Sequence, residues 1–181
     1  MLSPEEISSN KERIISLLKS VNREGMNNVL KYLDDNNFYD IPSSLSRHHN
    51  WEGGLAQHCL GVYDRLNKTG ESLPQDSVII VSLLHDICKA GKIYRNEGES
   101  EWHQRNEEDL QIPGHGNRSV KILEDLCGLE LSDQEKNAIR WHMGGYNLSK
   151  EEIRDYYRNK NSDLWRLLYN ADRYDASHNG N

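Results

Sequence analysis

Residues 76–89 read DSVIIVSLLHDICK, an almost continuously apolar stretch that ends in His85, Asp86 and Lys89. A helix that is apolar on nearly all sides is expected at the centre of a fold, where every face is covered. An ionisable pair buried at the end of such a helix is costly unless it has a partner, and a metal ion would be one. The stretch therefore predicts a central helix over residues 76–89 and a metal at its end.

Four other residues have side chains that bind metals: His58, His115, His142 and Asp172. Together with the His85-Asp86 pair, they occur along the chain at intervals of about 30 residues. A helix with its connection uses roughly 20–30 residues, so each interval could bring one more helix to a shared centre. Imidazole and carboxylate groups bind divalent metals such as Fe, Mn, Mg, Ni, Co or Zn. The pattern predicts a metal-dependent enzyme.

Composition narrows the classes of protein that the chain can belong to. Its 181 residues are expected to form one domain over residues 1–181. The net charge of -7 argues against a strong nucleic-acid surface, which needs clustered Lys and Arg, but allows a small phosphorylated substrate. The longest apolar runs are too short for a membrane span, and the polar start MLSPEEISSNKE predicts no secretory signal. Three cysteines without CxxC pairing indicate a cytoplasmic protein.

Helix signals dominate and predict an all-α bundle. Residues 1–36 are expected to form an N-terminal helical hairpin that starts at the capping box of Ser3 and Glu6, and residues 48–177 the core. Two more capping boxes, Ser132 with Glu135 and Ser149 with Glu152, predict later helix starts. The polar segment 92–113 is the exception: residues 92–104 fit a small β-hairpin, and the segment is expected to be a lid over the site.

The order His58, His85-Asp86, Asp172 resembles the H…HD…D pattern of the HD superfamily of metal-dependent phosphohydrolases. Members with two metals have two further histidines before the last aspartate, where His115 and His142 lie. The likeness spans about residues 48–177 and includes the contexts GGLAQH (53–58), LHDICK (84–89), GHG (114–116), RWHMG (140–144) and NAD (170–172). The chain is similar to small stand-alone bacterial HD hydrolases and to the HD domain of a bacterial 3′–5′ exoribonuclease.

The resemblance implies one or two divalent metal ions and a role for each residue. His58, His85, Asp86 and Asp172 would hold the first metal, and Asp86, His115 and His142 the second, with Asp86 bridging. Metal-activated hydroxide would attack phosphorus. Lys89 would act with Asp86 in catalysis by neutralising a phosphoryl oxyanion, and Lys89, Arg118 and His49 are the expected substrate contacts.

The expected substrate is a small phosphate monoester or diester, with a nucleotide as the leading class. The chain has no room for the OB-fold that accompanies the exoribonuclease domain, and it lacks the extended GYP signature of cyclic-di-GMP phosphodiesterases; both differences argue against polymers and cyclic-di-GMP as substrates. Two other functions stay open. Related folds with two irons oxidise their substrates with dioxygen, and iron suits the same ligands. A regulatory domain that binds a nucleotide without turnover is the other alternative.

Overall fold

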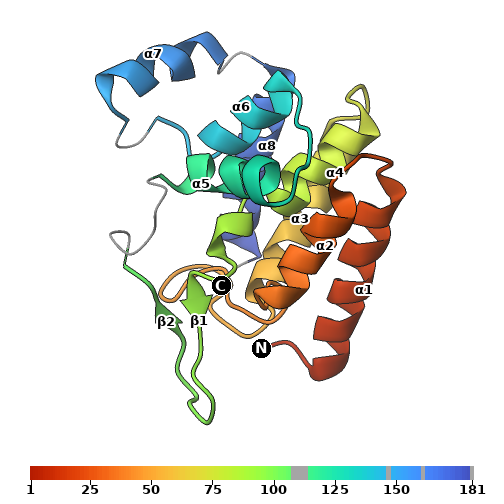
Figure 1. Cartoon of the computed structure of the whole chain (residues 1–181), viewed down its shortest axis with the longest axis vertical. Helices are drawn as coiled ribbons and strands as arrows, with labels where there is room; N and C mark the ends of the chain where they lie inside the picture. Colours follow the sequence, from red (N-terminus) through yellow and green to blue (C-terminus); the bar gives the residue numbers. More distant parts are fainter. Residues whose placement is uncertain (107–113, 146–147, 160–161, 180–181) are drawn as a thin grey trace.

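The computed structural model describes residues 1–106, 114–145, 148–159 and 162–179, which are mostly helical (Figure 1). The α-helices are α1 (Pro4–Ser20), α2 (Met26–Asp35), α3 (Gly54–Thr69), α4 (Gln75–Leu84), α5 (His115–Lys121), α6 (Asp133–Trp141), α7 (Lys150–Asn159) and α8 (Asp163–His178). The shorter elements are the 3-10 turn η1 (Ile87–Lys89), the π-helical turn η3 (Ile122–Leu126) and the strands β1 (Ile93–Tyr94) and β2 (His103–Gln104). The all-α prediction is confirmed.

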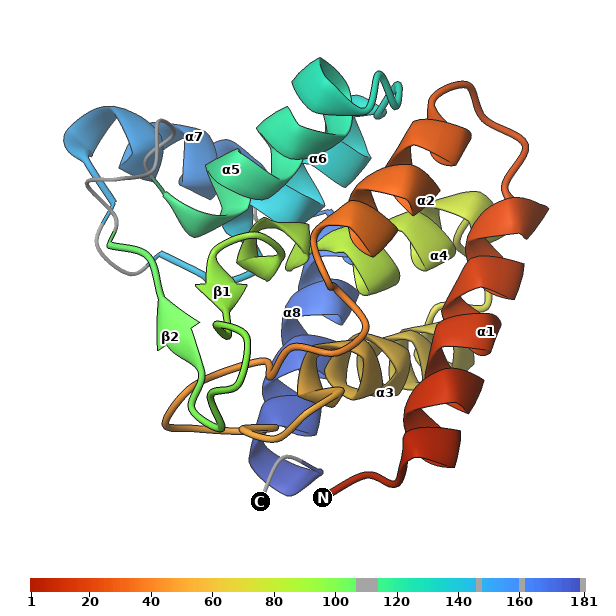
Figure 2. The same cartoon turned by 60° about the horizontal axis from the view of Figure 1, so that its bottom comes forward.

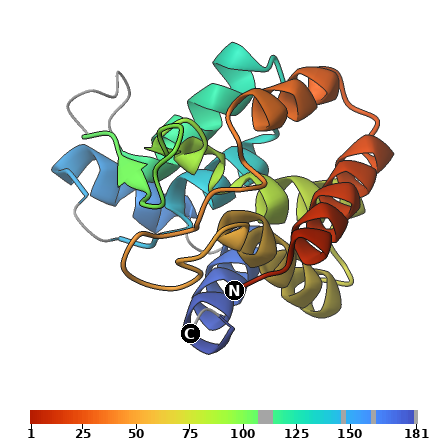
Figure 3. The same ribbon diagram turned by 90° about the horizontal axis from the view of Figure 1, so that it is seen from below.

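The helices form one bundle, in which α8 packs against both α3 and α6. This helix contacts α3, α4 and α6, and Figure 2 shows it passing through the middle of the molecule. The α1–α2 pair lies on one side and α7 on the opposite side (Figures 1 and 3). One continuous cluster of buried apolar side chains joins α1 to α8. None of the helices that the structure describes has the length and apolar character needed to cross a membrane.

The three predicted capping boxes are confirmed. Ser3 accepts a hydrogen bond from the backbone of Glu6, whose carboxylate accepts one from the backbone of Ser3. The same exchange occurs between Ser132 and Glu135 at the start of α6. Ser149 exchanges hydrogen bonds with Glu152 in the same way where α7 starts. Each box satisfies amide groups that the first turn of a helix leaves without partners.

The central helix ends earlier than predicted. Residues 77–84 of α4 are all buried, as expected of a helix that is apolar on every side. However, the helix stops at Leu84, and Asp86 has φ -105° and ψ 15° before the chain turns into η1. The prediction of one helix over residues 76–89 is therefore wrong at its C-terminal end. Adjacent side chains in a helix diverge by about 100°, and the break lets His85 and Asp86 face the same centre.

The predicted β-hairpin is confirmed within residues 92–104. Its two strands pair antiparallel, with Ile93 opposite Gln104 and Tyr94 opposite His103. The connection turns at residues 96–99, where Gly98 has φ +83°. That positive φ suits glycine because a Cβ would be strained there. The remainder of the expected lid, residues 107–113, lies outside the described residues.

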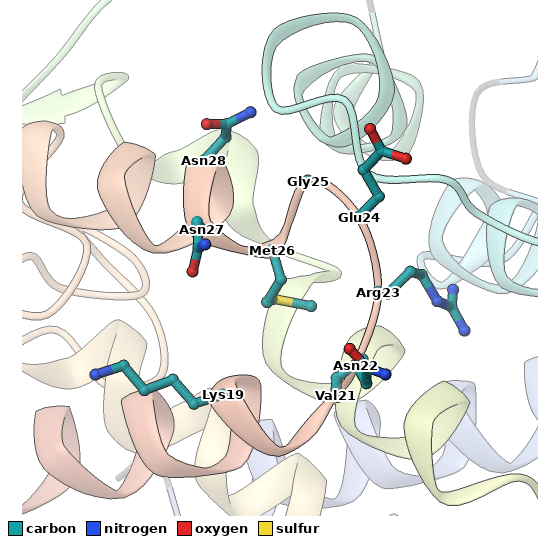
Figure 4. Close-up of a pocket in the computed structure, with 9 residues that line it drawn as sticks. All are labelled: Lys19, Val21, Asn22, Arg23, Glu24, Gly25, Met26, Asn27 and Asn28. Atoms are coloured by element: carbon teal, nitrogen blue, oxygen red, sulfur yellow. The ribbon is translucent and has the colours of Figure 1, made fainter.

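A buried carboxylate connects the N-terminal helices to the bundle. Glu135 in α6 is fully buried and accepts hydrogen bonds from both terminal nitrogens of Arg23, at 2.7 and 3.2 Å, and from the hydroxyl of Ser77 in α4 at 2.7 Å. Figure 4 shows Arg23 extending from the α1–α2 turn toward α6. Burial alone would raise the pKa of Glu135, but the hydrogen bonds from Arg23 and Ser77 hold it below its ordinary value.

We predict that Glu135→Ala lowers the free energy of unfolding by about 3 kcal/mol, because it removes the buried carboxylate that pairs with Arg23 and Ser77. Glu135→Gln should also destabilise, and its difference from the wild type should shrink as the pH falls below 4.5, since a carboxylate with a lowered pKa loses its contribution on acidification. Urea unfolding at several pH values measures both effects. Asp35→Ala, in the exposed pair with Lys31, is the control and should change little.

Candidate metal centre

The predicted metal ligands come together from five parts of the chain. His58 lies in α3, the His85-Asp86 pair follows α4, His115 begins α5, His142 follows α6, and Asp172 lies in α8. Within the predicted ligand set, three groups have their potential ligand atoms within 4.8 Å of one another: His58, His85 and Asp86; His85, His142 and Asp172; and Asp86, His115 and His142. A fourth group joins His48 and His49 to His58. Residues separated by more than a hundred positions therefore share one centre.

The first half of the centre surrounds the Nε2 atoms of His58 and His85. Nε2 of His58 lies 3.1 Å from Oδ1 of Asp172 and 3.9 Å from Oδ2 of Asp86. Nε2 of His85 lies 3.6 Å from the same Asp86 oxygen and 3.9 Å from Oδ1 of Asp172. Two imidazole nitrogens and two carboxylate oxygens thus face one small volume.

The second half uses the other oxygen of Asp86. Oδ1 of Asp86 lies 3.3 Å from Nε2 of His142 and 2.5 Å from Nε2 of His115. Each oxygen of this carboxylate therefore faces its own pair of histidines.

The hydrogen bonds of two histidines prepare them for a cation. Nδ1 of His85 donates to the carbonyl of Ser82 at 2.9 Å, and Nδ1 of His142 donates to the carbonyl of Ile139 at 2.6 Å. Since a carbonyl only accepts, the ring hydrogen is on Nδ1 and a neutral ring has its lone pair on Nε2. Both Nε2 atoms are buried and lack a hydrogen-bond partner among the described residues. Buried polar atoms normally have partners, so the arrangement fits a bound metal.

Helix ends place several of these side chains. His85 and His142 are the C-caps of α4 and α6, and the C-terminal end of a helix carries partial negative charge that favours a nearby cation. Gly116 brings α5 close to the end of α6, because a Cβ there would lie 2.1 Å from the carbonyl oxygen of Arg140. This close approach puts the rings of His115 and His142 5.2 Å apart.

Lys89 adds a positive charge beside the predicted ligands. Its Nζ lies 2.6 Å from Oδ2 of Asp86 and donates to the hydroxyl of Ser43 at 3.1 Å. Burial alone would lower the pKa of Lys89, but Asp86 raises it above its ordinary value, so the ammonium is charged at neutral pH. For His85, burial outweighs the nearby carboxylates and lowers the pKa to about 4, which keeps this predicted ligand neutral at pH 7.

A cavity of about 540 Å³ leads to the centre. Four of the predicted ligands and Lys89 line it, together with residues of the 43–48 loop, the hairpin and α8. The lining is rich in basic side chains: Arg47, Lys89, Lys92 and Arg173. The hairpin residues Ile93 and Gln104 form part of its wall, so the predicted lid segment does border the site.

The family model of the HD domain matches residues 55–177, a range that includes all of the predicted ligands. The chain belongs to the HD-domain family. A search of the curated proteins and a search of the solved structures return no match. Membership places the chain in a superfamily of metal-dependent phosphohydrolases, whose domains bind divalent metals, and the His/Asp cluster suits such a metal.

Two predicted substrate contacts of this HD domain lie outside the cavity lining. His49 is fully buried, with its Nε2 3.5 Å from Oδ2 of Asp175, and Arg118 is buried in α5. Neither lines the cavity in the described part of the chain, whereas His48 does. Their roles in substrate binding stay predictions. The backbone path of the loop decides which of the two neighbouring histidines, His48 or His49, faces the cavity.

Sequence reasoning missed two contacts of the HD centre. The thiol of Cys88 lies 3.1 Å from Nδ1 of His115, and the hydroxyl of Ser43 accepts from Lys89. The position of Cys88, two residues after Asp86, was a signal that could have suggested the first contact. Ser43 lies in an irregular loop more than forty residues before Lys89, and a local sequence pattern does not predict such a contact.

Another cavity, of about 480 Å³, lies at the α1–α2 turn (Figure 4). Its lining includes Lys19, Arg23 and Glu24, and the predicted ligands are not part of it. The guanidinium of Arg23 is already paired with Glu135 in the interior. This cavity belongs to the connection between the N-terminal helices and the bundle rather than to the metal centre.

We predict that metal binding to the HD domain releases protons. Burial alone would lower the pKa of His58, but the carboxylates of Asp172 and Asp175 raise it to about 9. A metal at Nε2 must displace the proton held there at pH 7, so the affinity for Mn²⁺ should rise as the pH increases toward 9. Calorimetric titrations in two buffers of different ionisation enthalpy measure the release. Equal heats in both buffers would contradict the prediction, and the exposed His103→Ala control should behave as the wild type.

Proposed function

We propose that this chain hydrolyses a phosphate monoester or diester of a small molecule, and that the substrate is a nucleotide. The observation that carries the proposal is the charged ammonium of Lys89, which contacts Asp86 and lines the cavity beside the candidate ligands. A protonated lysine does not help a site to bind a metal ion. A substrate with negatively charged oxygens does benefit from one.

His58, His85, Asp86 and Asp172 are suited to hold one metal, and Asp86, His115 and His142 a second. When bound, divalent ions supply Lewis acidity to a phosphoryl oxygen and promote ionisation of the attacking water. The chain's own contribution is orientation. Carbonyl acceptors fix the rings of His85 and His142, and Asp86 extends one oxygen to each half of the centre.

The cavity offers complementary charge to a phosphorylated substrate. Lys89 can donate to a phosphoryl oxygen while its ammonium stays next to Asp86, and it gains strength from burial because little water screens it. Arg47, Lys92 and Arg173 extend the positive lining outward, although the whole chain has a net charge of -7. This local reversal of charge favours anionic substrates over neutral ones.

The size and aromatic lining of the cavity support a nucleotide. A volume of about 540 Å³ lies in the range of small-ligand pockets. Tyr169 lines the cavity, and its hydroxyl accepts a hydrogen bond from Arg173 at 2.8 Å. The ring of Tyr169 stacks on Trp165 and has Arg173 over it, so its contact with a nucleobase would be through the ring edge and the hydroxyl.

We predict that Lys89→Gln lowers kcat by about 10²–10³-fold, the effect of removing one group that stabilises developing negative charge. Its affinity for Mn²⁺ should be retained, because Lys89 is not a ligand, whereas Asp86→Ala should lose both metal and turnover. The measurement is a panel of phosphatase and phosphodiesterase substrates with Mn, Mg, Fe, Co, Ni or Zn, followed by metal titration of each variant. Lys31→Gln, at an exposed ion pair, is the matched control.

Other outcomes of the same panel point to the alternative functions. Full turnover by metal-loaded Lys89→Gln would contradict the assigned role of Lys89. Substrate-dependent oxygen uptake by the iron-loaded protein would indicate a di-iron oxygenase, since iron suits the same nitrogen and oxygen ligands. Tight nucleotide binding without turnover, in protein that demonstrably contains metal, would indicate a regulatory domain.

A further inference from the structure

A buried carboxylate outside the predicted ligand set contacts the first half of the centre. Asp175 lies one turn after Asp172 in α8 and is almost completely buried. Its Oδ2 is 2.8 Å from Nδ1 of His58, on the opposite side of the ring from Nε2. A buried carboxylate is costly without strong partners, so its position against this imidazole calls for a functional explanation.

Other polar groups hold Asp175 in place. The side-chain amide of Asn179, one turn further along the chain, donates to Oδ1 at 2.8 Å. On the Oδ2 side, Nε2 of His49 approaches to 3.5 Å. The carboxylate of Asp175 therefore contacts residues of α3, of the loop before α3 and of the end of α8. Together these contacts fix its orientation.

The opposite helix has a gap that fits this carboxylate. Gly61 lies three residues after His58, on the same face of α3, and a Cβ at Gly61 would lie 2.0 Å from Oδ1 of Asp175. A distance this short is far inside van der Waals contact, so any larger residue would displace the carboxylate. The same face of α3 thus carries His58 and, at Gly61, leaves the space that the carboxylate of Asp175 occupies.

We propose that Asp175 is a positioning residue for His58. By accepting the hydrogen on Nδ1, the carboxylate keeps Nε2 facing Asp172 and Asp86, and it makes Nε2 a stronger metal ligand once the proton on that nitrogen has left. His85 and His142 are oriented by neutral carbonyls, whereas His58 has a charged acceptor. The inference rests on the proposed metal-binding role of His58 and is independent of which substrate is cleaved.

The test compares Asp175→Leu, Asp175→Asn and Gly61→Ala with the wild type for binding of Co²⁺ to the metal-free protein. We expect Asp175→Leu to weaken binding by about 10–100-fold. Asp175→Asn should lose less, because its amide oxygen still accepts from Nδ1. Gly61→Ala retains every ligand and the carboxylate but displaces Asp175, so it should also weaken binding. The visible absorption spectrum of bound Co²⁺ should change in all three variants.

Asp64→Asn is the matched control, since Asp64 is an exposed carboxylate on α3 that pairs with Arg13, and it should bind Co²⁺ as the wild type does. Thermal unfolding of the metal-free variants separates folding from binding. Unchanged affinity and spectrum in folded Asp175→Asn and Gly61→Ala would overturn the inference, even if stability fell. Failure of the wild type to bind Co²⁺ would overturn the proposed metal site as well, so the two failures are distinguishable.

Discussion

The rest of the structure depends on the contacts that surround the buried carboxylate of Asp86. Histidines from α3, α5 and the ends of α4 and α6 face its two oxygens, and Lys89 contacts one of them. An almost unexposed carboxylate is tolerated when cations or hydrogen-bond donors surround it. The packing of these helices around the end of α4 therefore provides partners for the buried charge of Asp86 and also covers apolar surface.

In the metal-free protein, protons supply part of the positive charge that ions would bring. Burial alone would lower the pKa values of His58 and His115, but neighbouring acidic groups raise them to about 9 and about 10. His85 has the opposite balance and stays neutral at pH 7, with a pKa lowered to about 4. Ion binding must change this mixture of charged and neutral rings. Acidity, metal affinity and stability are consequently coupled in this HD domain.

Local signals were sufficient to predict much of the fold. A capping box such as that of Ser3 depends on groups three residues apart, which are neighbours in any helix. The end of α4 was not predictable, since residues 76–89 contain no glycine or proline that would mark a helix end. His48 and His49 are adjacent and of the same residue type, so the sequence does not distinguish them. In the structure, His49 packs against Asp175 while His48 lines the cavity.

The sequence by itself determined which residues are suited to bind a metal, that they recur about every 30 residues, and that the chain is an HD-domain protein. These features depend on residue type and spacing, which a linear pattern contains. Tertiary structure alone decided where each ring nitrogen points, that Lys89 meets Ser43, and that Asp175 meets His58 across 117 positions of chain. Such contacts form between helix faces, and their geometry is set by packing, so a pattern along the chain does not encode them directly.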